Sequence, residues 1–191
     1  YNQNYQIEPF NILVDKDDQP LVEMPFALKL YEEPMSWGMV PVYYSGKIDL
    51  PVMWGDQITV VDHKTSGVMG DFFFKEQRVS PQQIGYCWSF YQLTGQRPTA
   101  FCINTIGSRS PPQKPKKGMD AWWAENFFRH KELLYDYQMD EWKNNTIALV
   151  QEFFWHYNRS FFPQKKKWCS GKYGLCGYYD VCDLPPTQRS L

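Results

Sequence analysis

The chain has 191 residues and a formal net charge of −1 at pH 7, so it is long enough for one domain with a buried core. This charge exerts no strong overall attraction on polyanions, and any nucleic-acid contact must come from a local basic patch. Hydrophobic residues make up 43% and charged residues 21% of the sequence, which excludes a disordered chain. No apolar run approaches the roughly 20 residues of a membrane span, and we expect no membrane partner.

Strand patterns fill the first third of the chain. Residues 21–31 alternate between apolar and other side chains, which predicts a strand with one buried face, and Pro25 within it favours a sheet edge. Residues 40–52 and 58–65 are rich in β-branched and aromatic residues, and residues 54–57 between them are typical of a turn. The pattern predicts that 40–52 and 58–65 form an antiparallel hairpin.

A helix is predicted next. Ser80, Pro81 and Gln83 are typical of a helix N-terminus, as the N-cap, the first helical residue and the reciprocal partner of a capping box. The helix is expected to run to about Leu93 and to end at Gly95.

The remaining elements complete a mixed α/β pattern. Residues 98–106 are strand-like, residues 107–118 form a loop rich in proline and bases, and residues 125–134 are compatible with a strand or a helix. Residues 140–157 show the periodicity of an amphipathic helix, with an apolar stripe that we expect to be core. The order of elements predicts a mixed α/β core.

Asp62 and Lys64 are the sharpest chemical signal. They lie two residues apart on a predicted strand and therefore share one face. With a symmetric turn, Asp49 lies opposite Asp62 on the neighbouring strand. Opposed carboxylates repel each other unless a cation lies between them, and carboxylate oxygens are the ligands that Mg²⁺ and Mn²⁺ prefer. The alternative is a charged cluster on the surface.

Four motifs in order resemble the PD-(D/E)xK nucleases of the RecB-like branch, which includes phage exonucleases and CRISPR adaptation nucleases. They are a G-x-I-D strand at residues 46–49, a V-D-H-K-T strand at 61–65, a Q-x-x-x-Y helix at 82–86 and a C-terminal cysteine cluster. The resemblance covers most of residues 21–182. It implies a restriction-endonuclease-like mixed β-sheet core flanked by helices, with a Cys-rich C-terminal appendage.

The resemblance implies a role for each matching residue on the two strands. Asp49 and Asp62 would bind Mg²⁺ or Mn²⁺, and the backbone carbonyl of His63 would complete the metal shell while its side chain points to the opposite face. Lys64 would position or activate the attacking water and offset charge on the phosphate.

Further candidate residues surround this set. Gln82 and Tyr86, four apart on one helical face, would contact DNA or brace the site, and Glu23 resembles an acid on the preceding strand of phage members. Bases in the loop at 107–118 are candidate phosphate contacts, with a solvated charge run as the alternative. These bases are Arg109, Lys114, Lys116 and Lys117.

The five cysteines argue against a secreted disulfide framework, because their number is odd and three of them cluster at Cys169, Cys176 and Cys182. Three nearby thiols favour a soft metal centre. The resemblance implies a [4Fe–4S] cluster, with Zn²⁺ or free thiols as alternatives. The family's fourth cysteine lies in a helical N-terminal part that this sequence lacks, so either that part lies upstream of Tyr1 or the site differs. Cys87 and Cys102 are more typical of buried small hydrophobic residues.

The sequence thus predicts a metal-dependent DNA nuclease, an exonuclease by resemblance, that hydrolyses phosphodiester bonds in DNA recombination or repair and is phage-encoded. Residues 1–160 would form the nuclease core and residues 161–191 the cluster-bearing tail. The expected partners are single-stranded DNA or duplex ends and a helicase or recombinase, in the cytoplasm of a bacterial or phage-infected host cell. The alternative is a non-catalytic nucleic-acid-binding module stabilised by an iron–sulfur or zinc centre.

Overall fold

The computed structural model describes residues 8–67, 71–78, 80–108, 118, 122, 126–159, 170–171 and 174–175. The chain divides into two compact units, Tyr1–Ala148 and Leu149–Leu191. The domain boundary predicted between residues 160 and 161 lies outside the described residues and stays a prediction. None of the described helices combines the length and the apolar character that crossing a membrane requires.

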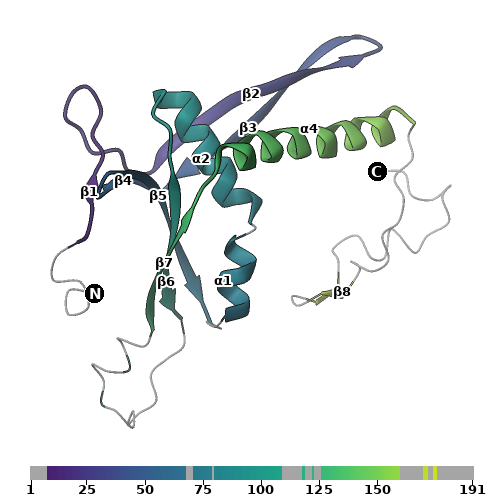
Figure 1. The fold of residues 1–191 in the computed structure, drawn as a ribbon. Coiled ribbons are helices and arrows are strands. Elements are labelled where there is room, and N and C mark those ends of the chain that lie inside the picture. The colour runs from purple at the N-terminus through teal and green to yellow at the C-terminus, as the bar shows by residue number, and fades with distance from the viewer. Residues whose placement is uncertain are drawn as a thin grey trace. The chain divides into compact units, whose positions relative to one another are not determined.

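The first unit contains a mixed sheet, which confirms the expected mixed α/β class. Among the described residues this sheet has five strands in the order β1-β4-β5-β6-β7. Figure 1 labels each of them. They are β1 (Asn11–Ile12), β4 (Leu50–Trp54), β5 (Gln57–Ser66), β6 (Ala100–Gly107) and β7 (Phe127–Leu133). Strands β5 and β6 are parallel, and the other neighbours are antiparallel. Because β6 has strand neighbours on both sides and an apolar cluster on each face, nearly all of its residues are buried.

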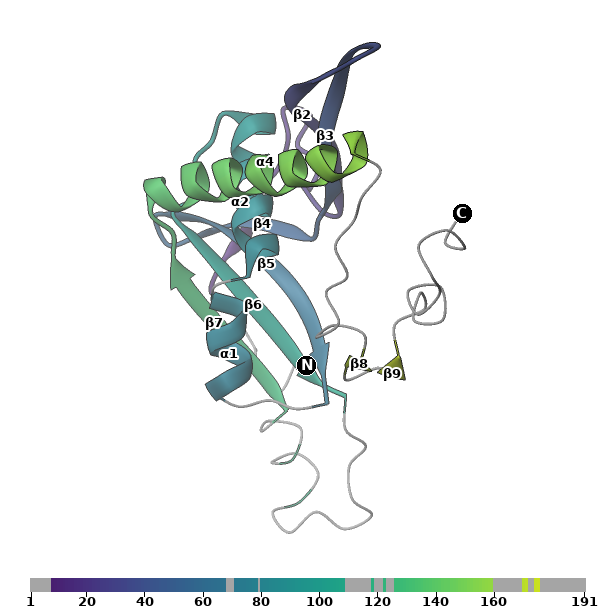
Figure 2. The ribbon, with the colours of Figure 1, turned by 90° about the vertical axis from the view of Figure 1, so that its right-hand side faces the viewer.

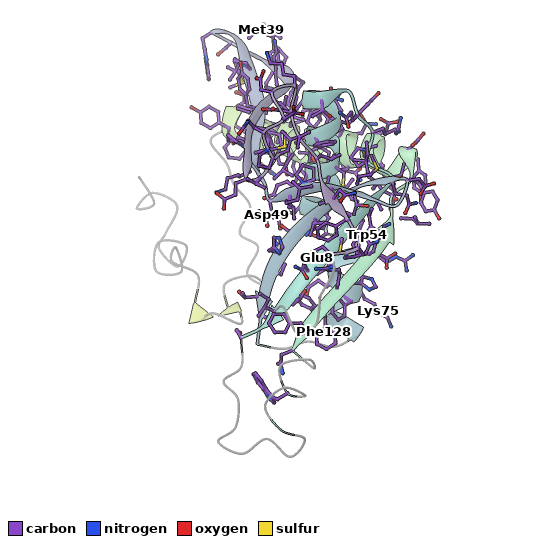
Figure 3. The ribbon with its side chains drawn as sticks, turned by 90° about the vertical axis from the view of Figure 1, so that its left-hand side faces the viewer. Glu8, Met39, Asp49, Trp54, Lys75 and Phe128 are labelled. Atoms are coloured by element: carbon purple, nitrogen blue, oxygen red, sulfur yellow. The ribbon has the colours of Figure 1, made fainter. Side chains whose placement is uncertain are left out.

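The single strand predicted over residues 40–52 is two strands in two different sheets. Strand β3 (Gly38–Ile48) pairs with β2 (Met24–Met35), whereas β4 pairs with β5. Asp49 is the one residue between them, and its backbone carbonyl accepts the N–H of Glu23 at 2.8 Å, which ties down the base of the β2–β3 hairpin. Figure 3 shows Met39 at the far end of this hairpin and Asp49 at its base. The hairpin predicted over 40–52 and 58–65 is therefore confirmed only for its inner part.

Helix α2 (Pro81–Thr94) begins and ends as predicted. Pro81 opens it, and Gly95 ends it in the left-handed conformation, with φ of 70° and its N–H bonded to the carbonyl of Tyr91. The predicted capping box is wrong, since Ser80 makes no side-chain cap bond. The side chain of Gln83, its expected partner, turns into the core.

The other described helices differ more from expectation. Helix α1 (Asp71–Arg78) was not predicted. Residues 125–134, left open as strand or helix, contain β7. Helix α4 (Asp136–Asn158) crosses the boundary between the units, and the second unit also holds the short pair β8 (Ser170–Gly171) and β9 (Gly174–Leu175).

The main core lies on the face of the sheet that α2 covers (Figure 2). Its buried members come from both sheets, α2, the first part of α4 and the link between β7 and α4: Phe26, Leu30, Ile48, Val60, Cys87, Trp88, Phe90, Phe101, Ile103, Leu134, Met139 and Trp142. A smaller cluster of Val52, Val61 and Cys102 covers the opposite face. The stripe predicted along residues 140–157 is core at Trp142. The prediction is wrong at Leu149 and Phe153, which are 67% and 51% exposed.

Candidate active site

The site begins where the pairing of β4 with β5 stops. The predicted register is confirmed, because Trp54 pairs with Gln57 and Leu50 with Val61. Asp49 follows just beyond the last pair. Its Oδ2 accepts the backbone N–H of His63 at 2.9 Å. The carboxylate thus replaces the backbone carbonyl that would accept this N–H if the two strands stayed paired. This bond holds the Asp49 carboxylate beside the residue that directly follows Asp62.

Asp62 lies on the face of β5 that α2 covers and is only 2% exposed. Its Oδ2 lies 2.9 Å from Nζ of Lys64 and accepts a hydrogen bond of 3.0 Å from Nε2 of Gln83. Burial of a carboxylate is costly unless such partners compensate it. The prediction that Asp62 and Lys64 share one face is thus confirmed, and the strand supplies a buried anion with its own cation.

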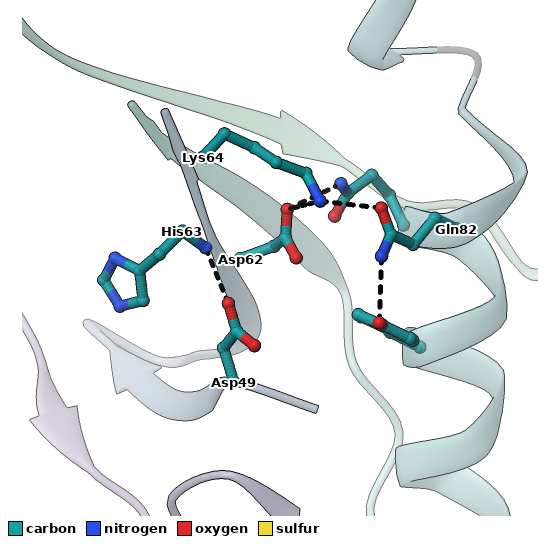
Figure 4. Close-up of polar contacts among 7 residues, drawn as sticks. Asp49, Asp62, His63, Lys64 and Gln82 are labelled. Carbon is teal, nitrogen blue, oxygen red and sulfur yellow. Dashed lines mark hydrogen bonds and ion pairs between the residues drawn. The ribbon is translucent and has the colours of Figure 1, made fainter. Parts of the chain in front are cut away.

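The ammonium group of Lys64 leads into a chain of hydrogen bonds on α2 (Figure 4). It donates to Oε1 of Gln82 at 2.7 Å, and Nε2 of Gln82 donates to the hydroxyl of Tyr86 at 2.9 Å. The expected shared helical face of Gln82 and Tyr86 is confirmed. Because Tyr86 takes the amide's donor end, the acceptor end of Gln82 is turned toward the lysine.

Gly46, the first residue of the G-x-I-D motif, allows β3 to approach the residues of this hydrogen-bond chain closely. A Cβ there would lie 2.8 Å from the ring of Phe26 and 3.4 Å from the ring of Tyr86. These two rings meet edge to face with centroids 6.0 Å apart. A side chain at position 46 would therefore displace the ring of Phe26, which packs against the ring of Tyr86.

His63 contributes to the site through its backbone. Its exposed side chain lies on the opposite face, as expected, where Nδ1 is 3.1 Å from Nδ2 of Asn104. The N–H and C=O of one strand residue point to the same side. Since the His63 N–H is bonded to Asp49, its carbonyl also faces the Asp49 side, as the expected role in a metal shell requires.

Glu23 makes a different contact from its expected catalytic one. Its exposed carboxylate accepts a hydrogen bond of 2.8 Å from Nζ of Lys47, and this bond together with the charge of Lys47 holds the pKa of Glu23 below its ordinary value. Among the described residues, no group of three or more His, Cys, Asp or Glu side chains is arranged to hold a metal ion. The catalytic role of Glu23 stays a prediction.

The donors that the structure does bring together suit a hard divalent cation. They are the Asp49 and Asp62 carboxylates and the His63 carbonyl, all of them oxygens. Mg²⁺ is usually bound by one or two carboxylates and keeps several waters, so two acids are a sufficient protein contribution.

Several expected site residues lie outside the described residues. These are the cysteines Cys169, Cys176 and Cys182 and the bases Arg109, Lys114, Lys116 and Lys117. Cys87 and Cys102 are described and fully buried, as predicted, in the two separate core clusters. Burial raises the pKa of both thiols, that of Cys102 to about 12, so neither is ready to serve as a thiolate ligand.

Comparisons with known proteins leave the family open. No family model matches the sequence, and no curated protein matches it. One solved structure, described as "Crystal structure of SSO0001", is similar over 67% of this chain with 12% identity and a TM-score of 0.32. The alignment spans 49% of that chain, about half of its length. A likeness at this TM-score carries no functional meaning for this protein.

Proposed function

We propose that this chain is a divalent-metal-dependent deoxyribonuclease that hydrolyses phosphodiester bonds. The observation that carries the proposal is the ion pair of the buried Asp62 with the partly buried Lys64, with the Asp49 carboxylate bonded to the intervening backbone at His63. A buried carboxylate and a partly buried ammonium group at the end of an apolar strand are expensive to maintain for stability alone. The motif resemblance described above supports the same function.

The residues fit the needs of phosphodiester hydrolysis. A divalent cation, when bound, supplies Lewis-acid polarisation of a phosphoryl oxygen and a more acidic water. Asp49 and Asp62 would hold it together with the His63 carbonyl. The ammonium group of Lys64 lies next to these acids and would stabilise the negative charge that develops on the phosphate oxygens.

Gln82 and Tyr86 give Lys64 a second anchor. The ammonium group of Lys64 has three N–H donors, and Asp62 and Gln82 take two of them, so one donor is left for a phosphate group. The acceptor oxygen of Gln82, oriented by the Tyr86 hydroxyl, keeps the ammonium group near the site. These two residues therefore act on the position of the lysine, in agreement with the bracing role that the resemblance implies.

The finer assignments rest on the resemblance. They are exonuclease rather than endonuclease action, action on single-stranded DNA or duplex ends, a restriction-endonuclease-like fold, a [4Fe–4S] cluster and a place in recombination or repair. We propose them as the most specific form of the function.

A nuclease assay with matched variants tests the proposal. The full chain is incubated with linear and covalently closed circular duplex DNA in the presence of Mg²⁺, Mn²⁺ or a chelator. The variants are Asp62→Asn and Asp56→Asn, which make the same chemical change in the site and in the exposed β4–β5 turn.

We expect the wild type and Asp56→Asn to degrade linear DNA only with metal, and Asp62→Asn to be at least about 100-fold slower. Circular DNA should survive if the enzyme needs an end. Equal degradation by wild type and Asp62→Asn would reject the assignment. Retardation of DNA in a gel without any degradation would favour the non-catalytic binding module instead.

A further inference from the structure

Gln83 is a buried polar residue that neither the capping box nor the Q-x-x-x-Y motif accounts for. Its side chain is fully buried, on the face of α2 that packs against the sheet. Its Nε2 donates to Oδ2 of Asp62 at 3.0 Å, so the buried amide is bonded directly to a proposed metal ligand. A buried amide needs such a partner, but the site could be filled at lower cost by an apolar side chain.

The contact fixes which oxygen of Asp62 is available. Two donors from different elements, Nζ of Lys64 on β5 and Nε2 of Gln83 on α2, meet the same oxygen, Oδ2. The terminal torsion of an aspartate is otherwise broad. With Oδ2 held in this way, the other oxygen, Oδ1, lies on the Asp49 side, as Figure 4 shows.

The orientation of the Gln83 amide is set by the carboxylate. Among the described residues, Oε1 of Gln83 is buried and has no hydrogen-bond partner. Turning the amide over would place this oxygen against Oδ2 of Asp62, where two acceptors repel each other. The amide therefore donates to Asp62 through Nε2 while its Oε1 stays buried without a hydrogen-bond partner. An apolar side chain, which would suffice for packing alone, would not carry this cost.

Gln83 and Lys64 hold Asp62 in different ways. Lys64 neutralises the carboxylate and, in the proposed reaction, also donates to the phosphate. Gln83 is neutral and buried, so it holds the carboxylate throughout without reducing the negative charge that attracts a cation. We infer that Gln83 is a positioning residue that presents Oδ1 of Asp62 to a divalent cation. This inference rests on the proposed function.

Mn²⁺ binding to the full chain without DNA tests it by calorimetry. Gln83→Met removes the donor at nearly the same length, and Gln83→Leu is a second variant in case the first folds poorly. Gln92→Met makes the same change at an exposed position of the same helix and serves as the matched control. Asp62→Asn reports on the metal site itself, and urea denaturation follows the stability of each variant.

We expect Gln83→Met to weaken Mn²⁺ binding about 10-fold. The Mn²⁺ concentration for half-maximal DNA cleavage should rise by the same factor, whereas cleavage at saturating Mn²⁺ should return close to the wild-type rate. Stability should change little, because the orphaned oxygen is removed together with the donor. Gln92→Met should match the wild type throughout.

The two proposals fail in different ways. If Asp62→Asn abolishes Mn²⁺ binding while folded Gln83→Met and Gln83→Leu bind as tightly as the wild type, the positioning role is wrong and the nuclease proposal stands. If the wild type binds no Mn²⁺, or Asp62→Asn binds it unchanged, both are wrong. A loss of stability in both Gln83 variants with unchanged Mn²⁺ affinity would also overturn the inference, because it assigns Gln83 a purely structural role.

Discussion

The carboxylate of Asp49 accepts the backbone N–H of His63 at 2.9 Å, across the point where two strands stop pairing. The bond brings a residue at a sheet junction into contact with the strand that carries Asp62 and Lys64. The Asp49 side chain thus has two properties that can be tested one at a time, its ability to accept this hydrogen bond and its negative charge.

Asp49→Asn separates these properties experimentally. The amide oxygen can still accept the His63 N–H, so we expect nearly wild-type stability in urea denaturation, but the loss of charge should reduce metal-dependent cleavage about 100-fold. Asp49→Ala removes both properties and should also lose about 1 kcal/mol of stability. Full activity of Asp49→Asn would show that its charge has no catalytic role.

Lys64→Met leaves the Asp62 carboxylate buried without its cation. The free energy of unfolding at pH 7 should fall by about 1–3 kcal/mol, less than for a fully buried pair, since Gln83 still donates to Asp62 and Lys64 is partly exposed. In the double variant Asp62→Asn/Lys64→Met, the losses should be clearly less than additive. Denaturation of the four proteins of this cycle measures the coupling, and strict additivity would contradict the ion pair.

Gly85→Ala tests the close packing of α2. Alanine normally favours a helix over glycine, by up to about 1 kcal/mol. Here a Cβ would lie 2.6 Å from both Cζ2 of Trp142 and the Tyr44 hydroxyl. We therefore expect a net loss of about 1–3 kcal/mol. Gly67→Ala, whose Cβ would meet its nearest neighbour at 3.6 Å, is the control and should change stability by less than about 0.5 kcal/mol.

The Glu23–Lys47 pair should be visible in a pH titration. Because the folded-state pKa of Glu23 is lowered by Lys47, the pair stabilises the fold above the unfolded-state value near 4.5. That contribution is lost as the pH falls through the lower folded-state pKa. NMR titration of the Glu23 side chain should give a midpoint below 4.5, and Lys47→Met should return it to the ordinary value. The same midpoint in both proteins would exclude the pair in solution.

Local sequence signals were sufficient to predict the elements whose ends are defined by a turn or by a helix-terminating residue. The short turn after Trp54 fixed the β4–β5 register, and with it the position of Asp49 next to the Asp62 strand. Pro81 and Gly95 marked the ends of α2, because each fits one backbone conformation well. The alternation in β5 correctly separated the direction of the His63 side chain from that of its two neighbours.

Tertiary contacts decided what local signals could not. Residues typical of strands stand on both sides of Asp49, so nothing at that position shows that the chain changes sheets there. Gln83 satisfies the spacing of a capping box, and its burial depends on the Asp62 carboxylate, which lies 21 residues earlier. One clue was present, since Gln83, Cys87 and Phe90 follow the helical period and two of the three are apolar.

The one-residue link at Asp49 restricts how this protein can vary in length. An extra residue between Ile48 and Leu50 would either carry the acid away from His63 or reverse the inward and outward directions along one of the joined strands. The Gly55–Asp56 turn at the other end of β4 is exposed and offers room for an insertion. Of the two ends of β4, insertions should therefore be made at this turn, because an added residue at the Asp49 link would disturb the site or the strand register.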